Sequence, residues 1–304
     1  MTDILSVYEA AATATAAEKK TPLLNGRYEL TGRTLGDGTS GTVFEAIDHG
    51  NHEQRIAIKI CETGGRISEY LEKLRREAVV GAGIPHHPNV CKTFDSFLIG
   101  SKFYIIMELV EGESFDIYIC KKKTRFALET QKFFLAILYQ MASAIAHLHY
   151  NGIVHCDIKP MNFVVSQNSD RTPRAVLIDF GFSTRFDKVE QVMIGTPYFM
   201  SPQVAKCSGI DKKCDMWAFG ILILLVLTKE EVPLYLKSTN DSCQAIVDLL
   251  QNLKDNPFPV RFTKDKDPMI ALFANIARRC LEIEPSMRPS AAEIAKDLLA
   301  FKAQ

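Results

Sequence analysis

The segment Val154–Asn162 carries an acid, a cation and an amide within six positions near the middle of the chain. The carboxylate of Asp157 could accept a proton from a hydroxyl group, and the ammonium of Lys159 could neutralise a transferring phosphoryl group. The amide oxygen of Asn162 could help to hold a metal ion. The same residues would also suit a polar turn after a helix, so this segment alone leaves both interpretations open.

A glycine-rich run, Gly36-Asp37-Gly38-Thr39-Ser40-Gly41-Thr42-Val43, lies between two predicted strands. Glycines allow a backbone to approach phosphate oxygens without obstruction by Cβ atoms. Dinucleotide-binding folds carry the same glycine spacing, but there the run opens a helix. Here the β-forming residues Thr42–Phe44 follow, which favours a hairpin that covers phosphates or a purely structural hairpin.

Three further charged residues could join the same site. Lys59 lies in a predicted strand between two isoleucines, and Glu77 follows 77 − 59 = 18 positions later on a predicted helix, from which it could fold back to pair with Lys59. Asp179 ends another predicted strand beside Gly181, a suitable position for a metal ligand. Taken singly, Lys59 could be an edge-strand lysine and Glu77 a solvated helix charge.

Hydrophobic periodicity predicts the elements that must position these side chains. The expected strands cover residues 28–35, 44–48, 55–60, 103–110, 163–165 and 175–178. Helices are expected over 69–80 and 130–150, and the apolar run 217–227 indicates a buried helix because it is too short to span a bilayer. Residues 1–27 are low in complexity and predict a flexible tail, whose apolar cluster at 4–8 could dock on the body or on a partner.

Composition limits the class of protein. The chain has 304 residues with 36 basic and 36 acidic side chains, so its balanced charge gives no argument for nucleic-acid binding. The eight cysteines are scattered without a C-x-x-C pair, which argues against a zinc site or a disulfide framework. No signal peptide or membrane span is visible. We therefore expect a soluble cytoplasmic protein without membrane insertion, with the nucleus left open.

In this order, the motifs resemble those of the eukaryotic-type protein kinase family, from about residue 28 to 301. The matching motifs are the glycine-rich run 36–43, Ala57-Ile58-Lys59, Glu77, the loop 155–162, Asp179-Phe180-Gly181 and the segment 195–203. The resemblance implies an α+β fold with two lobes: a small β-rich N-lobe with one helix at about 28–110, and a larger, mostly helical C-lobe at about 111–304.

The resemblance also assigns roles to individual residues. It implies ATP in the cleft and Mg²⁺ on Asn162 and Asp179, with Asp157 and Lys159 as the catalytic residues. Lys59 would hold phosphates with Glu77 as its partner. The implied ATP-binding residues are Leu35, Gly36, Gly38, Gly41, Val43, Ala57, Lys59, Glu77, Met107, Glu108, Val110 and Val164. Among these, Met107 would lie behind the adenine, and the backbone of Glu108 and Val110 would meet its edge.

Lys159, two residues after Asp157, is similar to the lysine of Ser/Thr kinases, and Gly195-Thr196-Pro197-Tyr198 resembles their substrate platform. The expected partner is a protein substrate with a serine or threonine acceptor. Two alternatives stay open: a pseudokinase that acts as an ATP-binding scaffold, and a kinase for a small molecule or lipid. Acidic residues at 111, 113 and 116 could favour a basic residue before the target hydroxyl, or be solvated charges.

Three positions depart from the family pattern. Cys156 replaces an arginine that usually receives an activation-loop phosphate, and a thiol cannot make that charged pair, so we expect activity without this phosphorylation. Gln203 replaces a glutamate that pairs with an arginine, here Arg288, and we expect an amide clamp weaker by about 1–2 kcal/mol. Gly81 replaces a bulky apolar residue, so we expect a loosely held helix that needs the N-terminal tail or an activating partner.

Overall fold

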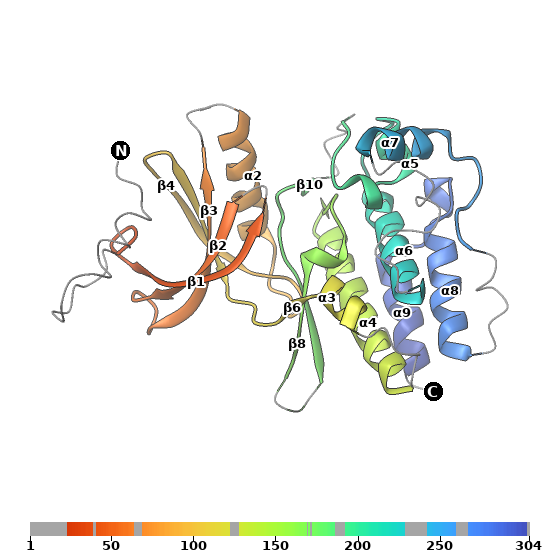
Figure 1. Cartoon of the computed structure of the whole chain (residues 1–304), viewed down its shortest axis with the longest axis horizontal. Coiled ribbons are helices and arrows are strands. Elements are labelled where there is room, and N and C mark those ends of the chain that lie inside the picture. The colour runs from red at the N-terminus through yellow and green to blue at the C-terminus, as the bar shows by residue number, and fades with distance from the viewer. Residues whose placement is uncertain are drawn as a thin grey trace.

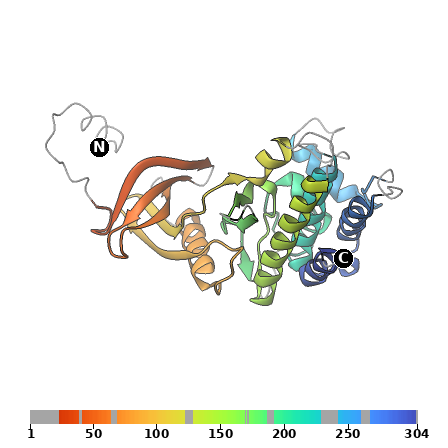
Figure 2. The same ribbon diagram turned by 90° about the horizontal axis from the view of Figure 1, so that it is seen from below.

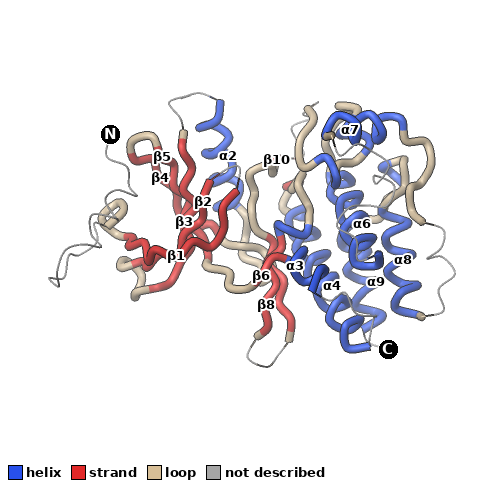
Figure 3. The backbone as a smooth tube through the Cα atoms, in the orientation of Figure 1, coloured by secondary structure: helices blue, strands red, loops and turns tan. Residues whose placement is uncertain are grey.

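The computed structural model describes residues 23–38, 41–63, 69–121, 128–168, 170, 172–185, 192–228, 242–259 and 267–302. Residues 1–22 of the predicted tail lie outside these ranges. A β-rich part occupies one end of the molecule and a mostly helical part occupies the other, as Figures 1 and 2 show. The tube in Figure 3 separates the strands of the first part from the helices of the second.

The N-terminal part is one antiparallel sheet of five strands in the order β1-β2-β3-β5-β4. The strands are β1 (Tyr28–Gly38), β2 (Gly41–Asp48), β3 (Gln54–Glu62), β4 (Thr93–Ile99) and β5 (Lys102–Glu108). Of these, β4 was not expected from the sequence. Strand alternation places Ile56 and Ile58 of β3 in one apolar cluster with Tyr104 of β5.

A single described helix, α2 (Glu69–Gly83), packs against this sheet. Leu71, Leu74 and Ala78 recur at helical spacing and form an apolar cluster with Phe103 and Ile105 of β5. The polar residues on the other side of the helix remain in solvent. This packing holds α2 on the side of the sheet that faces the helical part (Figure 1).

The C-terminal part is built around helices, whose bounds follow in chain order. They are α3 (Phe115–Lys121), α4 (Leu128–Tyr150), α5 (Pro202–Ala205), α6 (Lys212–Thr228), α7 (Cys243–Asn252), α8 (Pro268–Cys280) and α9 (Ala291–Lys302). Every residue of α6 from Cys214 to Leu227 is buried, as expected for a helix that is apolar all round. Within the described residues, only α4 has the length and apolar composition to cross a membrane, and half of that stretch is buried in the protein.

Short strands frame the loop that carries Asp157. A three-stranded sheet joins β6 (Glu113–Ser114), β8 (Phe163–Gln167) and β9 (Pro173–Leu177), and β7 (Ile153–Val154) pairs with β10 (Thr184–Arg185). The loop therefore begins at β7 and ends at β8, while Asp179 lies between β9 and β10. Both segments are held at each end by strand pairing, so their polar side chains are brought together by the sheets. The expected fold class is confirmed.

Candidate active site

Asp157 lies at the centre of a hydrogen-bonded cluster and is 3% exposed. Its Oδ1 accepts from the backbone N–H of Thr196 at 2.9 Å and from the Thr196 hydroxyl at 2.7 Å. Its Oδ2 lies 2.7 Å from Nζ of Lys159 and accepts from Nδ2 of Asn162 at 3.1 Å. Lys159 also donates to the Thr196 hydroxyl at 2.9 Å. The cluster fixes the orientation of a carboxylate that could receive a proton from a hydroxyl group.

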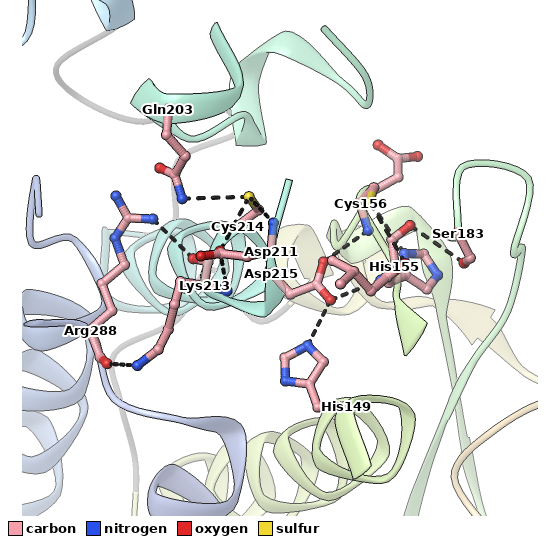
Figure 4. Close-up of polar contacts among 12 residues, drawn as sticks. His149, His155, Cys156, Ser183, Gln203, Asp211, Lys213, Cys214, Asp215 and Arg288 are labelled. Atoms are coloured by element: carbon pink, nitrogen blue, oxygen red, sulfur yellow. Dashed lines mark hydrogen bonds and ion pairs between the residues drawn. The ribbon is translucent and has the colours of Figure 1, made fainter. Parts of the chain in front are cut away.

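The loop backbone is anchored from below by Asp215 on α6, which is 1% exposed. Oδ2 of Asp215 accepts from the N–H of His155 at 2.9 Å and contacts Nε2 of His149 at 2.9 Å, and Oδ1 accepts from the N–H of Cys156 at 2.9 Å. Figure 4 shows these contacts converging on one side chain. Cys156 has a φ of 66°, a left-handed conformation that costs a non-glycine residue energy and that these hydrogen bonds hold in place.

Lys59 and Glu77 form a buried ion pair, with Nζ of Lys59 2.6 Å from Oε1 of Glu77 and 3.4 Å from Oδ1 of Asp179. Burial favours loss of the lysine proton, but the charges of Asp179 and Glu77 outweigh it and raise the pKa of Lys59. Burial would raise the pKa of Asp179, yet Lys59 and the N–H of Gly181 lower it overall. Lys59 is therefore a cation and Asp179 an anion at neutral pH.

The glycine-rich run forms the hairpin between β1 and β2, with Gly36 opposite Val43 and Gly38 opposite Gly41. Gly41 has a φ of 140°, and a Cβ atom there would lie 2.4 Å from the carbonyl oxygen of Ile60. Only glycine fits this position. The tip of the run, Thr39 and Ser40, lies outside the described residues.

Strand pairing brings several of the expected ATP-binding residues together. Val43 of β2 lies opposite Lys59 of β3, and Ala57 of β3 lies opposite Met107 of β5. Val164 of β8 lies opposite Ser114 of β6, just past the linker between the two parts. Leu35 and Gly36 lie on the exposed outer strand β1. Strand pairing thus places these residues on neighbouring strands, and the roles assigned to them stay predictions.

The linker itself is tied to both parts by its acidic side chains. Oε1 of Glu108 lies 2.9 Å from Nη2 of Arg174 on β9. Glu111 is paired with Arg55 at 3.0 Å and Glu113 with Lys121 at 2.6 Å. Val110, between Glu108 and Glu111, packs against the core of the helical part. Two of the three acidic residues past the linker are thus already paired within the chain.

Mg²⁺ fits the oxygen donors that the structure brings near Lys59 and Asp157. Mg²⁺ prefers carboxylate and other oxygen ligands and commonly takes only one or two from the protein when phosphates supply the rest. Asp179 offers a carboxylate, and Asn162 directs its Nδ2 to Asp157, so the amide oxygen is the atom left to bind a cation. The described residues contain no cluster of three His, Cys, Asp or Glu side chains that could hold a metal alone.

The expected clamp between Gln203 and Arg288 is wrong. Nε2 of Gln203 contacts Sγ of Cys214 at 3.5 Å, and its Oε1 is buried without a hydrogen-bond partner among the described residues. Arg288 instead donates to the carbonyls of Glu282 and Ile283 at 2.7 and 3.1 Å. It also donates to the carbonyl of Lys213 at 3.0 Å (Figure 4). An uncharged amide does not compete with three backbone oxygens for a guanidinium.

Gly81 lies in the expected stack but is not loosely packed. A Cβ atom on Gly81 would lie 2.4 Å from Oγ1 of Thr93 and 3.4 Å from the ring of Phe180. Phe180 in turn contacts the ring of His155, with centroids 5.8 Å apart. The absence of a side chain lets α2 approach β4 closely, so the expectation of a loose helix does not hold at this point.

Two functional residues were not among the sequence candidates. Thr196 was seen only as part of a substrate platform, yet its hydroxyl contacts both Asp157 and Lys159. Asp215 acts through backbone N–H groups, which no spacing rule reveals. The available signal was an aspartate at the start of the most apolar helix, because a charge buried in such a helix must satisfy specific donors.

The family described as "protein kinase domain" matches residues 30–299. Calcium-dependent protein kinase 7 of Arabidopsis thaliana is 29% identical over 271 residues, covering 88% of this chain and 48% of the relative. Calcium-dependent protein kinase 5 of Plasmodium berghei (strain Anka) is 33% identical over 202 residues, covering 66% and 34%. The serine/threonine-protein kinase dkf-2 of Caenorhabditis briggsae is 29% identical over 196 residues, covering 64% and 16%.

The chain thus spans about half or less of the length of these curated relatives. The family match, by contrast, covers nearly all of it and includes both the sheet that carries Lys59 and the loop that carries Asp157. The chain belongs to the protein kinase domain family.

Proposed function

We propose that the chain is a Ser/Thr protein kinase that transfers the γ-phosphate of Mg-ATP to hydroxyl groups of protein substrates. The observation that carries the proposal is the position of Lys59, 2.6 Å from Glu77 and 3.4 Å from Asp179. This contact requires α2 to lie inward against the sheet, and the charged groups needed around the phosphates are then assembled in one place.

Each residue has a defined task in this proposal. Lys59 binds phosphate oxygens, held in place by Glu77. Asp157 orients the acceptor hydroxyl and receives its proton, and Lys159 stabilises the negative charge that develops on the transferring group. Bound Mg²⁺ would neutralise phosphate charge, with Asp179 and Asn162 as its protein ligands. The remaining nucleotide-binding residues shape the pocket for the adenine and the phosphates.

Specificity for serine and threonine is supported by Thr196. Its hydroxyl bridges Asp157 and Lys159 at 2.7 and 2.9 Å, which ties the segment expected to bind substrate directly to the catalytic carboxylate. A platform of this kind is suited to a protein acceptor, which disfavours a small metabolite as acceptor. The intact pair of Lys59 and Glu77 likewise argues against a role as scaffold alone.

Independence from activation-loop phosphorylation is a further part of the proposal. The reason is Cys156, whose thiol donates to the carbonyl oxygen of Val154 at 3.7 Å and offers no cation to a phosphate. An activating partner at α2 remains a prediction, although the close contact at Gly81 reduces the need for one.

The deciding experiment measures γ-phosphate transfer from Mg-ATP to a generic basic protein by the enzyme with and without phosphatase treatment. Wild type is compared with Asp157→Ala. We expect transfer by wild type and its loss in the variant, with ATP binding retained in both because Asp157 is not a nucleotide ligand. A wild type that binds ATP but transfers nothing would overturn the proposal in favour of a scaffold. Activity that phosphatase abolishes would overturn only its phosphate-independent part.

A further inference from the structure

Three positions on α2, spaced four residues apart, face the segment that follows Asp179. Residues four apart on a helix lie above one another on one face. Here the three positions are Lys73, Glu77 and Gly81, and each meets a different residue of the segment 180–182. Lys73 lies at Phe182, Glu77 at Gly181 and Gly81 at Phe180, so the helix and the segment run in opposite directions.

The contacts at Glu77 and Gly81 are close. A Cβ atom on Gly181 would lie 3.1 Å from Oε2 of Glu77, and a Cβ atom on Gly81 would lie 3.4 Å from the ring of Phe180. A Cβ atom on Gly181 would require the Glu77 carboxylate to shift slightly, and one on Gly81 would be in van der Waals contact with the Phe180 ring. These two contacts place the central and C-terminal turns of α2 against the segment.

The contact at Lys73 has a different nature. Nζ of Lys73 lies over the ring of Phe182, 4.1 Å from its centroid, within the range of an attractive cation–π interaction. Both side chains are half-buried, so the interaction is less screened than on an open surface. Burial raises the pKa of Glu77 overall, and the positive charge of Lys73 is among the charges that oppose this rise, so the ammonium lies within electrostatic reach of the carboxylate that holds Lys59.

We infer that Lys73 is a positioning residue, which docks the N-terminal half of α2 on Phe182 and thereby keeps Glu77 on Lys59. The inference rests on the proposed kinase function. In this inference, a lysine and an aromatic ring link the helix to the segment 180–182, and the link needs no phosphate. Such a link suits a chain in which Cys156 supplies no cation for a phosphate to bind.

The experiment compares Lys73→Met, Lys73→Arg, Phe182→Leu and the double variant Lys73→Met/Phe182→Leu. The matched control is Arg75→Met, which removes a cation from the exposed side of the same helix, where Arg75 pairs with Glu72 at 3.1 Å. We measure kcat and KM for Mg-ATP and for a basic protein substrate. Hydrogen exchange of the α2 amides is measured on the same proteins without substrate.

Lys73→Met is expected to lower kcat about three- to tenfold, with KM for the protein substrate unchanged and faster exchange in α2. Lys73→Arg should retain activity, because a guanidinium also binds an aromatic face. Phe182→Leu should resemble Lys73→Met, and the double variant should be no worse than either single change. Arg75→Met should behave as wild type.

Equal effects of Lys73→Met and Arg75→Met, or additive effects of Lys73→Met and Phe182→Leu, would overturn the inference. Hydrogen exchange keeps the test separate from the proposed function. If wild type transfers no phosphate, the exchange of the α2 amides still shows whether Lys73 and Phe182 act as a pair. A silent enzyme with a coupled pair would refute the function and leave the docking role standing.

Discussion

Asp215, which is buried, and Gln203, which is half-buried, differ in how well their polar atoms are hydrogen-bonded. Asp215 uses both carboxylate oxygens, and the hydrogen bonds from His149 and the loop lower its pKa although burial alone would raise it. Gln203 uses its nitrogen for a long contact to a thiol and leaves its oxygen unpaired among the described residues. A buried polar atom without a hydrogen-bond partner lowers the free energy of unfolding by about 1–3 kcal/mol. We therefore expect a substitution of Asp215 to destabilise the protein and a suitable substitution of Gln203 to stabilise it.

Asp215→Asn is expected to destabilise the protein by about 1–3 kcal/mol and to lower kcat, because an amide nitrogen would face one of the loop N–H groups. The folded-state pKa of Asp215 lies below its ordinary value. Its stabilisation is therefore present above about pH 4 and disappears as the pH falls through the folded-state pKa. Denaturant unfolding of both proteins at several pH values should show their difference shrinking in acid. A constant difference would contradict this account.

Gln203→Glu is expected to stabilise the protein by about 1–2 kcal/mol by giving Arg288 an anion. Burial lowers the pKa of Arg288 to about 10, which is the mark of an inadequately compensated cation. Gln203 contacts Cys214 and Arg288 contacts Lys213, which are consecutive residues of α6, and from there we expect the new carboxylate to reach the guanidinium. Equilibrium unfolding measures the effect, with Gln203→Met as the uncharged control. Loss of stability relative to that control would refute the prediction.

At the scale of elements, the position of α2 decides whether Lys59 is correctly held. The helix approaches β4 through Gly81 and Thr93, and a Cβ atom would collide with the Thr93 side chain at 2.4 Å. Backbone-to-side-chain contact of this kind tolerates no added methyl group unless an element moves. The helix and the strand are therefore fitted to each other by one small and one medium residue.

Gly81→Ala should push α2 outward, lengthen the contact between Lys59 and Glu77 and lower kcat by at least about tenfold. Gly81→Ala/Thr93→Ala should recover much of the loss, because it removes the atom in collision. Gly83→Ala is the control on the same helix, since a Cβ atom there meets nothing within 4 Å. Steady-state kinetics compares the four proteins. Failure of the double variant to recover activity would mean that the helix is held in some other way.

At the scale of the whole molecule, the two parts meet at several points outside the site. The segment between α2 and β4 is hydrogen-bonded to the helical part, with N–H of Cys91 donating to Leu177 at 2.9 Å. The amide of Asn89 contacts Gln140 on α4 at 2.8 Å. Arg174 binds Glu108 of the linker. The C-terminal end of α2 is thus fastened to both parts, and a nucleotide between them would stabilise the whole chain.

Mg-ATP at 100 times its Kd is expected to raise the free energy of unfolding by about 2.7 kcal/mol. Asp179→Asn should lose the part of this stabilisation that depends on Mg²⁺, because an amide is a weaker ligand than a carboxylate. Asp157→Ala should retain it. Thermal unfolding with ATP, with and without Mg²⁺, measures the shift in Tm. Wild type that shows no shift with Mg-ATP would contradict the nucleotide site.

The sequence was most informative where chemistry and local structure coincide. The glycine-rich hairpin, the buried lysine strand and the loop at 155–162 each carry their signal within a few residues, and the structure pairs Lys59 with Glu77 as expected. Asp215 and Thr196 could not be found this way, because their roles depend on partners 60 and 39 positions away. Gln203 was misjudged because the sequence does not show that three backbone oxygens accept the hydrogen bonds of Arg288 and leave its charge without a carboxylate at Gln203.

The four-residue spacing of Lys73, Glu77 and Gly81 also determines how α2 can lose its contacts with the segment 180–182. One residue step on a helix turns it by about 100°, so any such rotation carries all three positions away from the segment 180–182 together. For a rotation of the whole helix, we therefore expect an engaged and a disengaged population rather than the release of one contact at a time. The turnover of an ensemble of molecules then reports the engaged fraction, and each 1.4 kcal/mol taken from that face shifts the ratio of the two populations about tenfold.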